Sequence, residues 1–172
     1  MAKLMKVIVT GPFNSGKTQF IGTVSDIDVV TTERKITTED RGIKGETTVA
    51  MDYGRVELDD VVIHLNGTPG QARFDFMWEI LTREMSGFIV LVDSIDKLSF
   101  ADARDLIALF QEYKSVPYLI AANKQDLDGA ASLYEVRRGV GVGDNILVMP
   151  CVATKKSSVQ QVLRQMISLV FA

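Results

Sequence analysis

The stretch Gly11-Pro12-Phe13-Asn14-Ser15-Gly16-Lys17-Thr18 constrains this chain more than any other, because it follows the pattern GxxxxGK(S/T). Such a stretch forms a phosphate-binding loop when its glycines let backbone N–H groups turn inward and its lysine reaches the outer phosphates. The threonine hydroxyl then serves Mg²⁺. The alternative is a glycine-rich turn that binds nothing, and the flanking segments decide between the two.

Both flanks favour the phosphate loop. Residues 4–9 are apolar and β-branched, which predicts a buried strand that ends at Thr10-Gly11. Residues 17–24 are compatible with a helix. The phosphates would therefore lie at a helix N-terminus, where unpaired N–H groups and the helix dipole attract anions.

Length and charge bound the function classes. The 172 residues predict one domain spanning residues 1–172, with 47% hydrophobic and 24% charged residues and no biased segment. A net charge of −3 without long charged runs gives no basic footprint, so nucleic acid is not expected as the principal ligand.

The single cysteine, Cys151, cannot form an internal disulfide and is typical of a reducing, cytoplasmic setting. We expect no signal peptide, because the first residues lead directly into a strand, and no membrane span of ~20 apolar residues. Myristoylation and prenylation signals are also lacking, so we expect no built-in membrane anchor.

Strand-like and helix-like segments alternate along the chain. Residues 26–46 predict a long functional loop, residues 47–58 and 61–65 a hairpin turning at Asp59-Asp60, and residues 74–85 a helix. Further strands are expected at 88–92, 118–122 and 146–149, and helices at 99–113 (capped by Ser99), at 133–138 and, with an apolar face, at 159–170. The pattern predicts a three-layer α/β fold: a mainly parallel six-stranded sheet, helices on both faces, and ligand at the carboxyl ends of the strands.

A second motif follows the strand at 118–122. Asn123-Lys124-Gln125-Asp126 matches the Asn-Lys-x-Asp guanine box, in which a carboxylate accepts hydrogen bonds from N1–H and the exocyclic amine of guanine. Adenine lacks that donor pair, and a site with buried polar groups can reject the wrong base by ~10⁴-fold. The alternative is a polar loop in which Asp126 caps a helix. The order and spacing relative to the phosphate loop favour the guanine box, and Asp126 disfavours an ATPase or kinase.

With these two motifs the chain resembles a Ras-superfamily small GTPase over its full length, and is most similar to the prokaryotic gliding and cell-polarity GTPases. The resemblance implies a P-loop G domain that binds GTP and GDP with Mg²⁺. It places Cys151-Val152-Ala153-Thr154 at the family's Ser-Ala-Lys segment, where only Ala153 matches and its N–H would contact the guanine oxygen. The implied nucleotide-binding residues are Asn14, Ser15, Gly16, Lys17, Thr18, Gln19, Gly70, Asn123, Lys124, Asp126, Cys151, Val152 and Ala153.

The resemblance also assigns the metal and catalytic positions. Thr18 and Thr48 would hold Mg²⁺, with Thr47 an alternative to Thr48. Catalysis would rest on Lys17, Thr48 and Gln71, the last orienting the attacking water, while the Gly70 N–H contacts the γ-phosphate.

Two departures from the family pattern stand near the γ-phosphate. Gly67 replaces the aspartate that holds Mg²⁺ through water, leaving Asp93 or a water as candidates for that gap. Phe13 is bulky where relatives have a small residue, so intrinsic hydrolysis should be slow. Arg34, Arg41 and Arg73 are candidates for an arginine supplied in cis, against the alternative of solvated loop charges.

Other polar and apolar groups have more ordinary interpretations. Asp93 and Asp96 are predicted to cap the next helix, and His64 to be a strand residue. The helix at 74–85 is apolar on two sides, which indicates either a partner surface or burial by neighbouring elements.

The sequence thus predicts a slow GTPase that switches between two conformations to engage regulators and effectors. By resemblance, one activating partner would be a roadblock-type protein. The alternative is a nucleotide-locked module (a pseudo-GTPase) that binds GTP without useful turnover.

Overall fold

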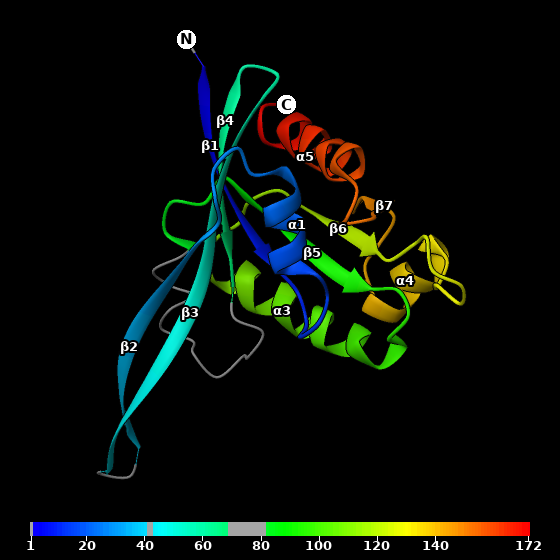
Figure 1. Ribbon diagram of the computed structural model, residues 1–172. Coiled ribbons are helices and arrows are strands. Elements are labelled where there is room, and N and C mark those ends of the chain that lie inside the picture. Colours follow the sequence, from blue (N-terminus) through cyan, green and yellow to red (C-terminus); the bar gives the residue numbers. More distant parts are fainter. Residues whose placement is uncertain (1, 41–42, 69–81) are drawn as a thin grey trace.

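The computed structural model describes residues 2–40, 43–68 and 82–172, and it describes residues 32–40 and 43–50 in their backbone only. Seven strands form one sheet in the order β2-β3-β4-β1-β5-β6-β7, with helices on both faces (Figure 1). The predicted three-layer α/β fold is confirmed. The sheet has seven strands where the sequence predicted six.

The bounds of the elements are as follows. The strands are β1 Lys3–Thr10, β2 Val30–Asp40, β3 Ile43–Leu58, β4 Val61–Gly67, β5 Gly87–Asp93, β6 Tyr118–Asn123 and β7 Val148–Pro150. The helices are α1 Lys17–Val24, α3 Phe100–Tyr113, α4 Leu133–Val140 and α5 Lys156–Val170, with a 3₁₀ turn η1 at Lys97–Ser99.

The five strands β4, β1, β5, β6 and β7 run parallel. Their residues are apolar and β-branched because both faces of a parallel sheet are covered by helices, and every residue of β5 is buried. The carboxyl ends of these strands meet at one edge. The loops that follow β1 and β6, which carry the two sequence motifs, therefore lie side by side.

The predicted loop at residues 26–46 is wrong, because it contains β2 and the start of β3. All eleven residues of β2 pair antiparallel with β3, and this hairpin projects from the body of the molecule (Figure 1). A loop was predicted because the segment lacks alternating apolar residues. A hairpin that extends away from the core does not need that pattern. β-branched residues such as Thr31 and Ile36 favour the strand instead.

The core lies in two layers on either side of the sheet. One cluster joins α1 and α5 to one face, and the other joins α3 and α4 to the opposite face. The predicted apolar face of α5 is confirmed, with Val159, Val162, Leu163 and Met166 fully buried. Among the described residues, no helix has the length and apolar character to cross a membrane.

The predicted helix caps after β5 are wrong. Ser99 Oγ donates to Asp96 O at 2.7 Å instead of capping α3, and no side-chain cap is made at η1. Asp93 accepts from Ile95 N at 2.9 Å, two residues on. His64 lies in β4 as predicted, with Nδ1 in a short hydrogen bond to the Tyr53 hydroxyl. Of the predicted helix at 74–85, residues 74–81 lie outside the described residues. Its two predicted apolar sides therefore stay a prediction.

Candidate functional site

The loop between β1 and α1 is shaped by residues with positive φ. Gly11 (φ 152°), Asn14 (φ 63°) and Gly16 (φ 103°) turn the backbone in ways that side chains usually prevent. A Cβ at Gly16 would collide with Asn123 Nδ2, and one at Gly11 with Leu91 O. The two glycines of the motif are therefore needed for the close approach of neighbouring groups as well as for the turn.

Lys17 opens α1 and folds back over the loop. Its Nζ donates to Gly11 O at 2.5 Å and to Pro12 O at 3.0 Å. Burial lowers the pKa of Lys17 to about 8, and the nearby Asp52 carboxylate opposes that shift. The first backbone bond from α1 is Phe20 N to Gly16 O at 2.8 Å, so the N–H groups of Lys17, Thr18 and Gln19 are available to an anion at the helix N-terminus.

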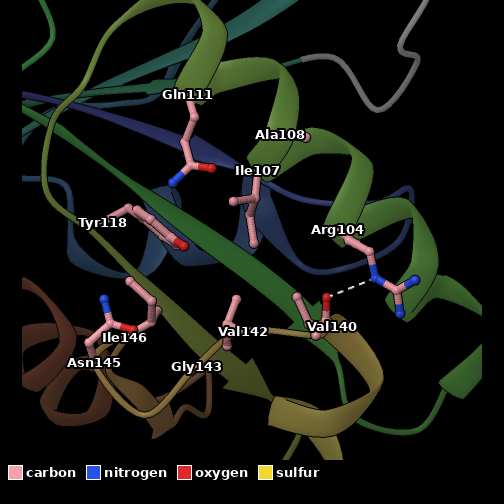
Figure 2. Close-up of a pocket in the computed structure, with 11 residues that line it drawn as sticks. Arg104, Ile107, Ala108, Gln111, Tyr118, Val140, Val142, Gly143, Asn145 and Ile146 are labelled. Atoms are coloured by element: carbon pink, nitrogen blue, oxygen red, sulfur yellow. Dashed lines mark hydrogen bonds between the residues drawn. The ribbon is translucent and has the colours of Figure 1, made fainter.

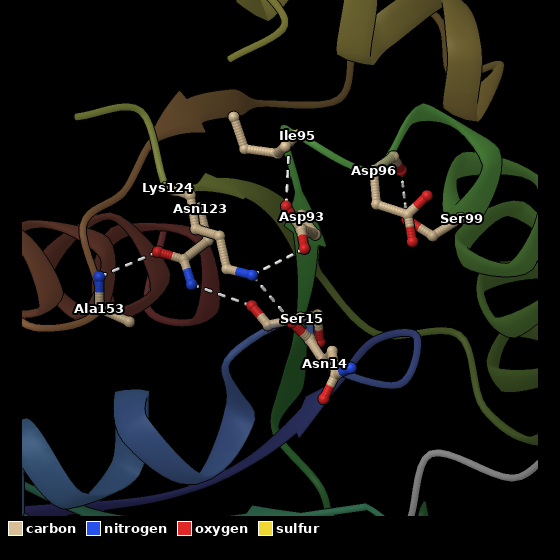
Figure 3. A network of polar contacts seen from close by, with 9 residues as sticks. All are labelled: Asn14, Ser15, Asp93, Ile95, Asp96, Ser99, Asn123, Lys124 and Ala153. Atoms are coloured by element: carbon tan, nitrogen blue, oxygen red, sulfur yellow. Dashed lines mark hydrogen bonds and ion pairs between the residues drawn. The ribbon is translucent and has the colours of Figure 1, made fainter. Parts of the chain in front are cut away.

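Asn123, the first residue of the base motif, joins three loops (Figure 3). Its Nδ2 donates to Ser15 O at 2.9 Å, and its Oδ1 accepts from Ala153 N at 2.9 Å. The side chain is almost fully buried. One amide thus fixes the phosphate loop, the base motif and the loop after β7 relative to one another.

Lys124 forms a second link between the motifs. Its Nζ lies 2.7 Å from Asp93 Oδ2 and 3.3 Å from Asn14 O (Figure 3). Asp93 is therefore occupied by Lys124 and by Ile95 N, which removes it as a candidate for the place left by Gly67.

Two adjoining cavities lie over these loops. The larger, of about 860 Å³, is lined by Phe13, Asn14, Ser15, Gly16, Lys17, Thr18, Gln19, Gly22, Asp52, Thr68 and Lys124. The smaller, of about 240 Å³, is lined by Gly16, Gln19, Asn123, Lys124, Asp126, Leu127, Val152, Ala153 and Thr154. Most predicted nucleotide-binding residues thus meet in one continuous region, in which the phosphate loop lines the larger cavity and Asp126 the smaller.

Asp52 is the residue that the sequence prediction missed. It lies in β3, where its Oδ2 accepts from Thr18 Oγ1 at 2.6 Å and its Oδ1 from Thr31 Oγ1 at 3.0 Å. Gly67 in β4 is its pairing partner in the sheet. An aspartate inside a strand is disfavoured, and that unusual placement was the available signal.

Several predicted residues lack the predicted contacts or lie away from the cavities. Cys151 is fully buried in the core, where burial raises the pKa of its thiol to about 12. The Ala153 N–H, predicted to donate to guanine, is bonded to Asn123 Oδ1. Thr48 lies in β3 opposite Lys35, and Arg34 lies in β2, both described in backbone only. Gly70, Gln71, Arg41 and Arg73 lie outside the described residues, so their predicted roles stay predictions.

The residues present fit a nucleotide phosphate with Mg²⁺. Ser15 Oγ is buried and has no hydrogen-bond partner among the described residues, as expected of a group that a ligand satisfies. Lys17 supplies positive charge, and the Thr18 hydroxyl and the Asp52 carboxylate supply the oxygen ligands that Mg²⁺ prefers. Mg²⁺ bound there would neutralise phosphate charge.

A further cavity of about 330 Å³ lies between α3 and the loop after α4 (Figure 2). Arg104 is the single charged side chain among its described lining residues. Its guanidinium is occupied by Val140 O at 3.0 Å and Gly139 O at 2.8 Å. This cavity therefore offers no comparable chemistry for a phosphate.

A phosphate loop, a base motif and the carboxyl-edge position of both define a P-loop guanine-nucleotide-binding domain of the small GTPase class. Comparison with known families agrees, since the model of the ADP-ribosylation factor family matches residues 1–170. The chain belongs to this family of the Ras superfamily.

Individual relatives are distant. An uncharacterized protein of Methanocaldococcus jannaschii is 36% identical over 124 residues, covering 72% of this chain and 71% of that protein. The human ADP-ribosylation factor-like protein 4A is 33% identical over 87 residues, covering 49% of this chain and 44% of that protein. The Arabidopsis thaliana ADP-ribosylation factor-like protein 8d is 29% identical over 145 residues, covering 82% and 75%.

Proposed function

We propose that this protein is a molecular switch that binds GTP and GDP with Mg²⁺ and hydrolyses GTP slowly. The observation that carries the proposal is the pair of hydrogen bonds made by the Asn123 side chain. They link Ser15 of the phosphate loop to Ala153 beside the base cavity. A rigid connection of this kind sets the distance between a phosphate subsite and a base subsite, as a nucleoside phosphate requires.

The chain's own residues would act by position and charge. Lys17 and the N–H groups at the start of α1 would hold the β- and γ-phosphates, and Thr18 would offer its hydroxyl oxygen to Mg²⁺. Thr48 and the Gly70 N–H are the proposed γ-phosphate contacts, and Gln71 is the proposed group that orients the attacking water. Asp126, which lines the smaller cavity, would select guanine.

Base selectivity tests the proposal. GTP and GDP should bind far better than ATP, and Asp126→Asn should shift the preference toward xanthine nucleotides, because an amide can donate to the xanthine oxygen that a carboxylate repels. Competition among ATP, GTP and XTP for a fluorescent nucleotide measures this. Equal affinity of the wild-type protein for ATP and GTP would contradict it.

The second candidate is a nucleotide-locked module that binds GTP without useful turnover. Phe13 favours it, since its side chain is 75% exposed in the phosphate loop and lines the larger cavity, where it can obstruct an incoming catalytic group. Single-turnover hydrolysis with and without Phe13→Gly separates the two functions. A slow GTPase hydrolyses GTP as the wild type and gains rate in the variant, whereas a module locked by Phe13 is inactive as the wild type and gains activity only in the variant.

Regulators and effectors that bind the switch regions are the proposed partners, a roadblock-type activator among them, and the cytoplasm is the proposed location. Membership of the gliding and cell-polarity branch remains a prediction that rests on the sequence resemblance. Stimulation of GTP hydrolysis by such a partner, and its loss in Gln71→Leu, would support this part of the proposal.

A further inference from the structure

The larger cavity contains one carboxylate among its described lining residues. That carboxylate is Asp52, and the same cavity holds Lys17 and the Thr18 hydroxyl of the phosphate loop. Protein sites for Mg²⁺ at a phosphate usually provide one or two carboxylates, because the small dication needs negative oxygen ligands beyond those of the phosphate. Asp52 is thus positioned to meet a requirement that no other described group in this cavity meets.

The carboxylate is fixed by hydroxyl groups from two elements. Thr18 Oγ1 of α1 donates to Oδ2 at 2.6 Å, and Thr31 Oγ1 of β2 donates to Oδ1 at 3.0 Å. A hydroxyl that gives its proton to Asp52 keeps its lone pairs directed elsewhere, so Thr18 can bind a cation with its oxygen. Partners of this kind orient metal ligands and raise their basicity.

Gly67 gives this arrangement the space it needs. Gly67 pairs with Asp52 across β3 and β4. A Cβ at Gly67 would lie 3.4 Å from Asp52 Cβ and 3.0 Å from Ile21 Cδ1. A larger residue at this position would crowd the Asp52 and Ile21 side chains.

We infer that Asp52 supplies the carboxylate of the Mg²⁺ site, acting from β3 in the place that Gly67 leaves without one, and that it positions the Thr18 hydroxyl toward the metal. The inference rests on the proposed function and deepens it. Asp52 also lies near Lys17, so the same carboxylate balances the positive charge of the phosphate loop while the site holds no nucleotide.

The test is the release of a fluorescent GDP analogue measured against free Mg²⁺ set with EDTA. Asp52→Asn keeps the shape of the side chain and removes its charge. The Mg²⁺ midpoint, which is the free Mg²⁺ concentration that slows GDP release half-maximally, should therefore rise by about tenfold or more. Release without Mg²⁺ should remain that of the wild type. The exposed Asp28→Asn is the matched control and should leave the whole curve unchanged.

Each result has a defined meaning. A variant that releases GDP faster by the same factor at every Mg²⁺ concentration has lost only structure, and this overturns the inference, as does an unchanged midpoint. A wild type that binds no GDP analogue contradicts the proposed function itself, whereas an unchanged midpoint in a nucleotide-binding protein contradicts only the role of Asp52.

A relocated carboxylate gives a second test. The exchange Asp52→Gly with Gly67→Asp removes the Asp52 side chain from beside position 67, leaves the contact with Ile21 Cδ1, and moves the charge to the neighbouring strand. Its Mg²⁺ midpoint should come within about threefold of the wild type, because the site regains its charge. Circular dichroism checks folding. A folded exchange variant with the midpoint of Asp52→Asn overturns the assignment of Gly67's place to Asp52.

Discussion

The base side of the site and its metal side are built differently. On the base side, Asn123 is almost fully buried and makes two hydrogen bonds of 2.9 Å to loops from other parts of the chain. On the metal side, the Asp52 carboxylate is held by Thr18 and Thr31 hydroxyl groups, and Thr31 belongs to a hairpin that projects from the body.

The base subsite is therefore held in one arrangement, whereas the arrangement around Asp52 can change. Two buried bonds to backbone groups leave the base subsite one arrangement, because an unpaired buried group is costly. Hydroxyl groups near solvent can exchange protein partners for water or a ligand at little cost. The proposed switch would need both: a base subsite that holds the nucleotide in either state, and a metal side that responds to the γ-phosphate.

The largest expected effect comes from breaking the fixed side. Asn123→Ala removes both bonds and leaves Ser15 O and Ala153 N unpaired, so the free energy of unfolding should fall by about 2–4 kcal/mol. GDP affinity should fall by about 100-fold, because the two subsites lose their relative position. Chemical denaturation and nucleotide titration measure these losses. The exposed Asn145→Ala should change neither, and a similar loss in that control would contradict the role of the bridge.

Lys17 gives the next effect, through pH. Its pKa of about 8 in the free protein means that raising the pH from 7 to 9 removes the charge that phosphates require. GDP affinity should therefore fall by up to about tenfold, since one pH unit above the pKa leaves one tenth of the lysine protonated. Lys17→Arg keeps its charge and should show a weaker dependence. Equal dependence in both proteins would place the titration elsewhere.

The same lysine has the opposite effect on the stability of the free protein. Its folded pKa of about 8 lies below the ordinary lysine value of 10.5, so between these pH values the unfolded chain binds more protons. The contribution of Lys17 to stability should therefore rise with pH through that window while nucleotide affinity falls. Denaturation of the nucleotide-free protein at pH 8 and pH 10, with Lys17→Arg for comparison, checks the sign.

A smaller effect is expected at the Lys124–Asp93 pair, which supports the fixed side from its rim. Asp93→Asn keeps the acceptor for Ile95 N and removes the charge that Lys124 contacts at 2.7 Å. Because Lys124 is partly exposed, the loss should be about 1 kcal/mol of stability, with GDP affinity reduced severalfold. The control is Asp96→Asn at an exposed position, which should change neither quantity. A loss as large as that of Asn123→Ala would show that the base subsite is held chiefly by charge.

The smallest effect should come from the hairpin. Thr31→Val keeps the shape of the side chain and removes the hydroxyl that donates to Asp52. Stability should change by less than about 0.5 kcal/mol, as for most exposed substitutions, and the Mg²⁺ midpoint for GDP release by about twofold. A midpoint shift as large as that of Asp52→Asn would mean that the hairpin, and not α1, positions the carboxylate.

The sequence located the phosphate loop and the base motif but missed Asp52, and the reason is physical. The phosphate loop and the base motif are local patterns whose backbone shapes depend on residues close in sequence, such as Gly16 and Lys17. Asp52 acquires its role only from the pairing of β3 with β4, which places it opposite Gly67. Such a contact depends on strand register, and a local pattern does not carry that information.

Two other predictions differ from the structure through hydrogen bonds that the patterns did not include. The predicted caps at Ser99 and Asp96 fit the local sequence, yet the 3₁₀ turn before α3 directs Ser99 Oγ to Asp96 O. The predicted guanine contact of the Ala153 N–H did not include its partner Asn123, which lies 30 residues earlier in the chain. The first is a local hydrogen bond over three residues and the second a tertiary contact, and neither follows from the helix-capping or motif pattern alone.

The Asn123 bridge also orders events during synthesis. It joins groups 108 residues apart on one side and 30 on the other, and its last member, Ala153, lies after β7. A chain emerging from the ribosome can therefore form the phosphate loop early but cannot hold both ends of a nucleotide until nearly all of it has been made. Contacts of such long range form late and slowly. Nucleotide binding would accordingly stabilise the finished domain, while its earlier folding intermediates must persist without that help.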